Sequence, residues 1–179
     1  MKKILILLLK LIGALFIVGA IAVFAIIIKY RLELPNLQSM VEDYKPQMAT
    51  IIYDKNNNVV DTLSVEAREV VKLEDVSPYV KDAFLAIEDK QFYSHHGLNF
   101  KGIARAVITT FLKGRATQGG SSITQQLAKN AFLTPEKTFS RKVKEAILTY
   151  QIERTYTKDE ILERYLNEIY YGSGSYGIK

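Results

Sequence analysis

One glutamate of this chain has neighbours that suit it to proton transfer. Glu88 precedes Asp89 near the end of a predicted helix, with Phe84 about one turn before it and Phe92 about one turn after it. A carboxylate beside aromatic rings loses part of its hydration, which makes it a better proton acceptor. On spacing alone, a Glu-Asp pair on an ordinary surface explains the same residues at least as well.

A second glutamate, Glu145, also has two interpretations. It follows Arg141 by four residues, a spacing typical of an ion pair on a solvated helix face. Alternatively, it is the second acid of a site for chemistry at the C1 carbon of a sugar. There one acid moves a proton and another organises the reacting groups. Spacing leaves both interpretations open.

The segment 119–130 combines backbone freedom with polar side chains. Two glycines precede Ser121 and Ser122, and Gln125, Gln126 and Lys129 follow in the first turns of a predicted helix. A helix start with hydroxyl and amide groups suits a sugar or an anion. A well-capped surface helix is the simpler alternative.

An apolar segment at the N-terminus is predicted to place these residues beside a membrane. Residues 11–28 carry no charge, and 18 helical residues span about 27 Å, close to a hydrocarbon core of about 30 Å. A cleaved signal peptide is the alternative, although its apolar region is usually shorter, about 7 to 15 residues. We therefore predict a transmembrane helix at residues 11–29.

The lysines near the N-terminus indicate an orientation for this helix. Lys2, Lys3 and Lys10 precede the apolar run, so the positive-inside rule puts residues 1–10 in the cytoplasm and the remaining chain outside. The predicted location is the inner (cytoplasmic) membrane, crossed once. Residues 30–49 are expected to be a juxtamembrane connector, and residues 50–179 a catalytic domain.

Basic residues are concentrated in one part of this domain. Between Lys101 and Glu145 there are nine basic and two acidic residues, although the whole chain carries a net charge of +5. A solvated face is the usual reason for such a run. Beside a membrane, the phosphate or pyrophosphate of a lipid is a better partner for it than a nucleic acid.

The domain is predicted to be mainly helical, with one β-hairpin at 50–63 around a polar turn. Capping residues indicate where helices begin, and hydrophobic spacing indicates which side is buried. Helix starts are expected at Ser77, Asn99, Ser121 or Ser122, and Thr157. The expected buried side chains are Val80, Phe84 and Ile87; Ile103, Val107, Ile108 and Phe111; Val143, Ile147 and Tyr150; and Ile161, Leu162, Tyr165, Leu166 and Ile169.

Some classes of chemistry lack the residues they need. The chain has no cysteine, which excludes disulfides and thiolate chemistry, and the adjacent His95 and His96 cannot alone complete a zinc site. The 179 residues of this sequence contain no Ser-x-x-Lys, Ser-x-Asn or Lys-Thr-Gly motif, so they cannot form a penicillin-binding transpeptidase.

Four ordered motifs resemble those of the family 51 glycosyltransferases, the peptidoglycan polymerases of class A penicillin-binding proteins and of monofunctional enzymes. Glu88-Asp89-Lys90-Gln91-Phe92-Tyr93-Ser94-His95-His96-Gly97 is similar to ED-x-x-F-x-x-H-x-G, and the 119–130 segment is similar to G-x-S-T-I-T-Q-Q. Arg141-Lys142-Val143-Lys144-Glu145 matches R-K-x-x-E, and residues 158–172 resemble the fourth motif. Four motifs in one order are highly specific.

The resemblance implies a lysozyme-like fold, with a large lobe and a smaller membrane-embedded lobe, and an inverting reaction on lipid II. Glu88 would take the proton from the 4-hydroxyl of the acceptor GlcNAc, which attacks C1 of the donor MurNAc as undecaprenyl pyrophosphate leaves. Glu145 would help to position the reacting groups. The growing β-1,4-linked glycan stays lipid-linked, and the cell-wall synthesis machinery is a further possible partner.

The resemblance also names the residues expected to bind substrate. They are Arg105, Ser121, Gln125, Gln126, Lys129, Lys137, Arg141 and Lys142. Lys137 stands where many members have arginine, and Ser122 stands where the family usually has threonine. Dependence on a divalent cation (Mg²⁺ or Mn²⁺) is common in the family, but the sequence offers no evident ligand set for one.

The resemblance covers about residues 50–179 and stops inside the expected fifth motif. We therefore expect a glycosyltransferase domain that is incomplete at its C-terminus, with a transpeptidase domain beyond residue 179 in the full protein. Two alternatives remain: a lysozyme-like peptidoglycan hydrolase, which shares the fold and an acidic catalytic residue, and an inactive membrane-anchored fragment.

Overall fold

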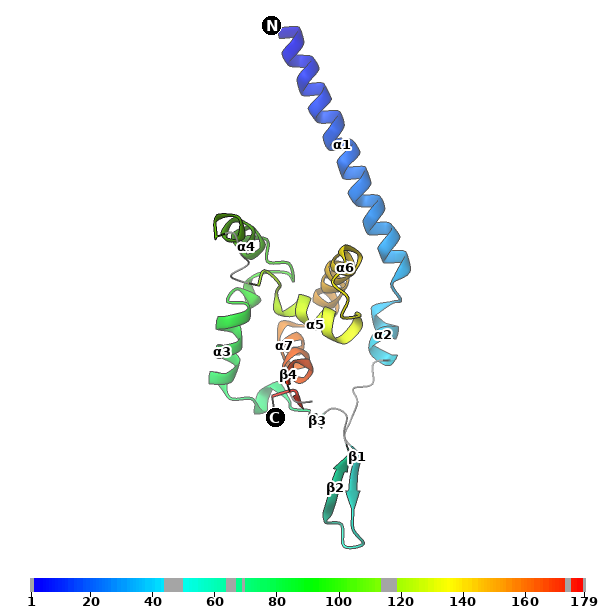
Figure 1. Cartoon of the computed structure of the whole chain (residues 1–179), viewed down its shortest axis with the longest axis vertical. Helices are drawn as coiled ribbons and strands as arrows, with labels where there is room; N and C mark the ends of the chain where they lie inside the picture. The colour runs from blue at the N-terminus through cyan, green and yellow to red at the C-terminus, as the bar shows by residue number, and fades with distance from the viewer. Residues whose placement is uncertain are drawn as a thin grey trace. The chain divides into compact units, whose positions relative to one another are not determined.

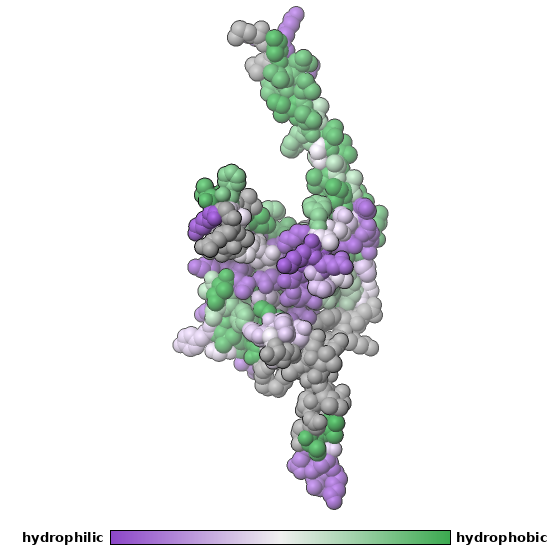
Figure 2. All heavy atoms as spheres, in the orientation of Figure 1, coloured by the Kyte–Doolittle hydropathy of each residue, from purple (hydrophilic) through white to green (hydrophobic). Residues whose placement is uncertain are grey.

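The computed structural model of the chain describes residues 2–43, 50–63, 67–68, 70–113, 119–172 and 175–178. The chain divides into two units, Met1–Pro35 and Asn36–Lys179. The first unit is one helix, α1 (Lys2–Glu33), of 32 residues. It is apolar and long enough to cross a membrane, and none of its most apolar stretch is buried (Figures 1 and 2). Lys10 lies within α1, which also continues beyond residue 29.

The second unit is mainly helical. Its helices are α2 (Leu37–Asp43), η1 (Leu73–Asp75), α3 (Pro78–Glu88), η2 (Phe92–Ser94), α4 (Phe100–Lys113), α5 (Ile123–Phe132), α6 (Phe139–Thr155) and α7 (Lys158–Glu168). Its strands are β1 (Thr50–Tyr53), β2 (Val59–Leu63), β3 (Ala67–Arg68), β4 (Tyr170–Gly172) and β5 (Ser175–Tyr176). Within the range expected to be a connector, residues 37–43 form α2 with Leu37 buried, whereas residues 44–49 lie outside the described part.

The core lies where α5, α6 and α7 pack together (Figure 1). Helix α7 contributes four apolar side chains, Ile161, Leu162, Tyr165 and Leu166, as the hydrophobic spacing predicted, whereas Ile169 of the same predicted stripe follows α7 and is only partly buried. The two other helices contribute Ile123, Leu127, Ala128, Leu148 and Ile152. Burial of apolar side chains at about 25 cal/mol per Å² is the main force that holds these helices together.

Local signals in the sequence predicted the helix starts correctly. Ser122 caps α5 and Thr157 caps α7, each in a capping box with the residue three positions later, Gln125 or Glu160. Asn99 caps α4, because its Oδ1 accepts a hydrogen bond from Gly102 N at 2.8 Å. Ser77 occupies the N-cap position of α3, but its side chain makes no capping hydrogen bond.

The predicted hairpin is confirmed, whereas a second sheet was not predicted. Strands β1 and β2 pair antiparallel around the Lys55–Asn58 turn, with an irregularity between Ile52 and Tyr53. The second sheet has the order β3-β5-β4, with β3 parallel and β4 antiparallel to β5. Its strands have two or three residues, too few to produce an alternating pattern.

Three predictions of buried faces were wrong at least in part. On α4, Ile108 and Phe111 are exposed, Phe111 by 88%, and the Val107 side chain is outside the described set. Of the three residues predicted to be buried on α3, Val80 and Ile87 are exposed, and Phe84 packs against other aromatic rings. Periodicity identified an apolar stripe on each helix, but it could not show which of its residues another element covers.

On α6 the buried face differs from the predicted one. The structure buries Glu145, Leu148, Thr149 and Ile152, whereas Tyr150 is exposed. This face mixes apolar and polar side chains, because Thr149 Oγ1 donates to the Glu145 carbonyl and the Glu145 carboxylate has its own partners. A hydrophobic stripe cannot identify a face that buries a glutamate.

Candidate active site

A cleft of about 620 Å³ brings together half of the predicted site residues. It lies between the C-terminal end of α3, the first half of α4, the segment before α5 and the first turns of α5. Its charged and polar lining side chains are Glu88, Asp89, Lys90, Gln91, Asn99, Arg105, Ser121, Ser122, Gln126 and Lys129. The residues 114–118 that precede this segment are outside the described part.

Glu88, the last residue of α3, presents its carboxylate to this cleft. Its Oε2 accepts a hydrogen bond from Gln126 Nε2 at 2.8 Å. The predicted aromatic neighbours instead contact other rings: Phe84 meets Tyr165 and Tyr171 edge-on, and Phe92 is fully buried against Tyr93. The tyrosine whose hydroxyl interacts electrostatically with the Glu88 carboxylate is Tyr165. Burial and then the nearby Glu88 charge raise the pKa of Tyr165 well above its ordinary value.

Asp89 fixes the end of α3 against the rest of the cleft. Its buried carboxylate accepts hydrogen bonds from His95 Nε2 at 2.7 Å, from Ile123 N at 3.3 Å and from Asn99 Nδ2 at 3.4 Å. These donors come from three segments, so Asp89 holds the residue before it, Glu88, in register with the starts of α4 and α5. Sequence reasoning gave Asp89 and His95 no such role. Their place within the first motif was the available signal.

Glu145 is buried, not solvated, with only 2% of the residue exposed. Its Oε1 pairs with Lys142 Nζ, three residues earlier, and accepts a hydrogen bond from Gln125 Nε2 at 3.4 Å. The pair with Arg141, one of the two interpretations left open by the sequence, is therefore replaced by a pair between the buried Glu145 and the half-exposed Lys142. Lys142 Nζ also donates to Ser121 Oγ at 3.0 Å, and Ser121 lines the cleft. Glu145 thus reaches the cleft through Lys142.

Neighbouring glutamines on α5 contact the two glutamates separately. Gln126 donates to Glu88, and Gln125 donates to Glu145. The Gln125 side chain is buried, and its Oε1 accepts from Ser122 N at 3.0 Å, so its amide is already used inside the domain. Gln126 lines the cleft, whereas Gln125 does not belong to its lining.

The predicted cations are divided between the cleft and its surroundings. Arg105 and Lys129 line it, and Lys142 joins it through Ser121. Lys137 lies exposed between α5 and α6, outside the lining. Arg141 is also outside the lining, and its buried Nε has no hydrogen-bond partner among the described residues. Cations beside a hydroxyl-bearing helix start make the cleft suitable for a phosphate-bearing ligand.

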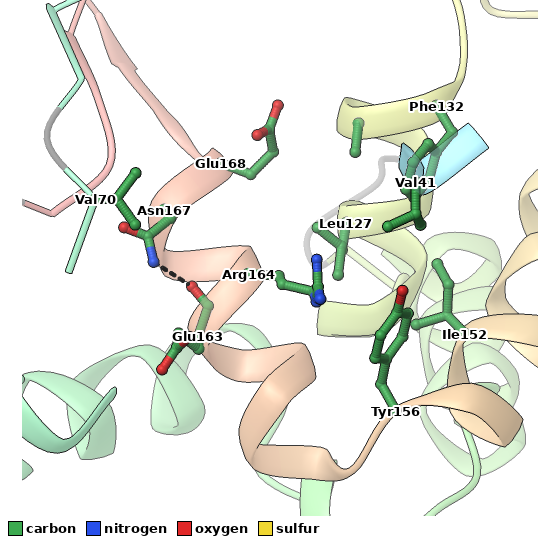
Figure 3. Close-up of a pocket in the computed structure, with 11 residues that line it drawn as sticks. Val41, Val70, Leu127, Phe132, Ile152, Tyr156, Glu163, Arg164, Asn167 and Glu168 are labelled. Atoms are coloured by element: carbon green, nitrogen blue, oxygen red, sulfur yellow. Dashed lines mark hydrogen bonds between the residues drawn. The ribbon is translucent and has the colours of Figure 1, made fainter. Parts of the chain in front are cut away.

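A second cavity, of about 310 Å³, lies on the other face of α5, and none of the predicted catalytic or substrate-binding residues lines it (Figure 3). Its lining is mostly apolar, with Val41, Leu127, Phe132 and Ile152. The polar side chains at this cavity mainly form hydrogen bonds within the domain. For example, Asn167 Nδ2 donates to the Glu163 carbonyl at 2.8 Å, drawn as a dashed line in Figure 3. We therefore assign the chemistry to the cleft at Glu88.

A family model described as Transglycosylase matches residues 56–179. The match covers more than half of the chain and includes every residue of the cleft described above. The chain belongs to the transglycosylase family.

The chain is also similar to several penicillin-binding proteins. The chain is 44% identical to penicillin-binding protein 1A of Aquifex aeolicus over 179 residues, which is 100% of this chain and 24% of the relative. It is 51% identical to penicillin-binding protein 1F of Bacillus subtilis over 128 residues, 72% of this chain and 18% of the relative. Penicillin-binding protein 1A of Neisseria flavescens is 45% identical over 165 residues, 92% of this chain and 20% of the relative. The chain spans about a fifth of the length of these relatives.

Membership in the transglycosylase family confirms the resemblance inferred from the four motifs and the mainly α fold class. In this structure the first motif supplies Glu88 and Asp89, the second supplies α5, and the third supplies Lys142 and Glu145. The described residues contain no group of three or more His, Cys, Asp or Glu side chains that could hold a metal ion.

Proposed function

We propose that this chain is a peptidoglycan glycosyltransferase that joins lipid II units into β-1,4-linked glycan strands with inversion at C1. One observation carries the proposal. Glu88 lies in a cleft with Arg105 and Lys129, and one of its carboxylate oxygens is held by Gln126. Such a cleft offers a base and cations to the same ligand, as transfer from a pyrophosphate-activated sugar requires.

Glu88 is the proposed general base. Its Oε2 is held by Gln126, whereas Oε1 has no hydrogen bond from the described residues. In the proposed step, Oε1 accepts the proton of the acceptor GlcNAc 4-hydroxyl while that oxygen forms a bond to C1 of the donor MurNAc. The bond between C1 and the pyrophosphate oxygen breaks, and undecaprenyl pyrophosphate leaves with the electron pair.

The leaving pyrophosphate requires cations that are already in position when charge develops. Lys129 and Arg105 line the cleft, and Lys142 is held beside Ser121 by its pair with Glu145. Glu145 therefore acts in this proposal by orienting Lys142. Lys137 and Arg141 are proposed to bind the donor from outside the cleft lining.

No protein ligand set for a divalent ion is present among the described residues, since Asp89 accepts from three donors and Glu145 is paired with Lys142. These residues do not fit a resident metal site. A Mg²⁺ or Mn²⁺ ion in this proposal would accompany the pyrophosphate oxygens of the substrate.

The proposed location is the outer face of the inner membrane, with α1 as a single-pass anchor and its N-terminus in the cytoplasm. The length and composition of α1 support the anchor. Helix α4 supports contact with the lipid, because Phe100, Ile108, Phe111 and Leu112 are all exposed. Figure 2 shows hydrophobic surface where α4 lies. Large exposed apolar patches mark interaction surfaces, and a lipid-linked substrate must reach the cleft from the bilayer.

The experiment is polymerisation of lipid II by the purified full chain in detergent or liposomes, compared with Glu88→Gln. Glu88→Gln keeps the shape of the side chain and removes the base, so we expect turnover to fall by about 10²- to 10⁴-fold. The matched control is Glu74→Gln, which changes an exposed glutamate on η1. Polymer formed equally well by Glu88→Gln would refute the role of this residue.

A hydrolase is the alternative outcome of the same experiment. The cationic cleft favours a pyrophosphate leaving group, which a hydrolase of completed glycan does not meet. Completed glycan is therefore supplied in a parallel reaction. Cleavage of that glycan, with lipid II left unchanged, would overturn the proposed synthase.

A further inference from the structure

Beneath the cleft, Tyr165 lies against both Glu88's helix and Gln126. It belongs to α7 and is completely buried, and its ring meets Phe84 edge-on with 6.2 Å between the ring centroids. Phe84 is one turn before Glu88 on α3. The Tyr165 hydroxyl donates to Gln126 Oε1 at 3.5 Å, a long hydrogen bond, while Gln126 Nε2 donates to Glu88.

These three groups form a directed chain of donors. It runs from the Tyr165 hydroxyl to the Gln126 carbonyl oxygen, and from the Gln126 amide nitrogen to the Glu88 carboxylate. A side-chain amide has a donor end and an acceptor end, which a half turn exchanges. A donor behind the carbonyl favours the orientation in which the NH₂ group faces Glu88, and successive hydrogen bonds in a chain polarise one another.

We propose that Tyr165 is a positioning residue for the proposed base, because it holds the Gln126 amide with its NH₂ group toward Glu88. This inference rests on the proposed function of the cleft. The Tyr165 hydroxyl keeps its proton throughout the working pH range, since burial and the Glu88 charge raise the pKa of the phenol well above its ordinary value. It is therefore a permanent donor.

The orientation matters for the chemistry because the two ends of the amide favour different forms of Glu88. The NH₂ end stabilises the carboxylate, which can accept a proton. The carbonyl end would accept a hydrogen bond only from the protonated acid, which cannot act as a base. Tyr165 is expected to extend the active form of the cleft toward lower pH.

Other charged and titratable groups line the same cleft or lie behind Tyr165. They come from every element around the cleft and are Asp89 and Lys90 after α3, Arg105 on α4, Lys129 on α5 and, behind Tyr165, Tyr171 on β4. Tyr165→Phe leaves all of them in place. It also keeps the ring that packs against Phe84, so the change is confined to one hydroxyl group.

The first measurement follows the Gln126 side-chain amide by ¹⁵N NMR in the full chain in detergent micelles, with Gln126→Met to assign the signal. We expect the NH₂ resonances of Gln126 to shift in Tyr165→Phe. The control is Tyr93→Phe, which removes a hydroxyl that donates to Asp159 at 2.9 Å and is not part of the cleft lining. This measurement does not require activity, and an unchanged Gln126 amide would overturn the proposal.

The second measurement is the pH profile of lipid II polymerisation. In Tyr165→Phe we expect the acid limb of kcat to move upward by about 0.5 to 1 pH unit, with KM nearly unchanged. A merely structural role would lower turnover by the same factor at every pH, and that result would contradict the proposal.

Gln126→Met tests the same chain of donors with Tyr165 intact. It should move the acid limb in the same direction, and the double variant with Tyr165→Phe should move it no further than Gln126→Met alone. If the two substitutions displaced the acid limb of the pH profile additively, the proposal would be refuted. If Tyr165→Phe does not fold, an acid limb that stays in place in Gln126→Met would refute it as well. Absence of polymer from the unchanged chain would count against the proposed function, whereas the amide signal would still test Tyr165.

Discussion

Gln126 donates a hydrogen bond from Nε2 to Glu88 Oε2 at 2.8 Å, and the residue before it, Gln125, donates to Glu145 Oε1 at 3.4 Å. Adjacent residues on a helix point in different directions, about 100° apart. One turn of α5 can therefore lie between two acids that come from different helices. A displacement of α5 would disturb both acids together, which links the stability of α5 to the proposed chemistry.

The pair between the buried Glu145 and the half-exposed Lys142 should respond unequally to loss of either partner. Lys142→Met leaves a buried carboxylate without its cation, so we expect the free energy of unfolding to fall by about 3 to 5 kcal/mol. Glu145→Gln leaves Lys142, whose side chain is 49% exposed and can be hydrated, so a smaller loss of about 1 to 3 kcal/mol is expected. Urea unfolding measures both, and a larger loss for Glu145→Gln would contradict the burial argument.

Gly97 should tolerate no side chain. Its φ of +85° is unfavourable for other residues, and an added Cβ would lie 2.6 Å from Thr149 Cγ2 and 2.8 Å from Glu153 Cγ. We expect Gly97→Ala to lower the free energy of unfolding by more than about 2 kcal/mol.

Two other glycines separate the causes of this loss. Gly172 has a φ of +97° but open space around it, so Gly172→Ala reports the backbone strain alone, expected at about 1 kcal/mol. Gly119 has open space and no such φ, so Gly119→Ala should leave stability nearly unchanged. Equal losses at Gly97 and Gly172 would show that the contacts with Thr149 and Glu153 do not matter.

Some tyrosines of the folded chain should ionise late. Burial, with help from Asp159, raises the pKa of Tyr93 to about 12, and burial raises the pKa of Tyr171 to about 12. A raised pKa means that the folded state holds the proton more tightly than the unfolded state, whose phenols titrate near pH 10. The resulting stabilisation is complete below pH 10 and is lost as the pH rises through about 12.

Ultraviolet absorbance of the phenolate measures this difference. We expect a delayed fraction of the phenolate signal in the folded chain, and a single early transition in urea. Tyr93→Phe and Tyr171→Phe should each remove part of the delayed fraction. A folded chain that titrates in one step near pH 10 would contradict this expectation.

The orientation of α1 can be tested with single cysteines, because the chain has none of its own. Asn56→Cys places a thiol in the exposed hairpin turn, and Lys3→Cys places one near the N-terminus. In intact spheroplasts we expect a membrane-impermeant maleimide to label Asn56→Cys, and to label Lys3→Cys only after permeabilisation. The reverse pattern would overturn the proposed orientation.

Local features of the fold were predictable because neighbouring residues determine them. The capping boxes at Ser122 and Thr157 each use a residue three positions later, and the β1–β2 hairpin needs only its own turn. The buried side of α7 was also predictable, since four large apolar residues follow one helical stripe. The sides of α4 and α6 were not, because exposure of Phe111 and burial of Glu145 depend on which other elements lie against them.

The sequence by itself determined an apolar N-terminal helix, the helix starts, the hairpin and four motifs that indicated the family and the two glutamates. Only the tertiary structure decided how these parts meet. Gln126 with Glu88, Lys142 with Ser121, and β3 with β5 all join residues that are far apart along the chain. Such pairs form because helices and strands pack on particular faces, and the energies that select those faces are spread over the whole core.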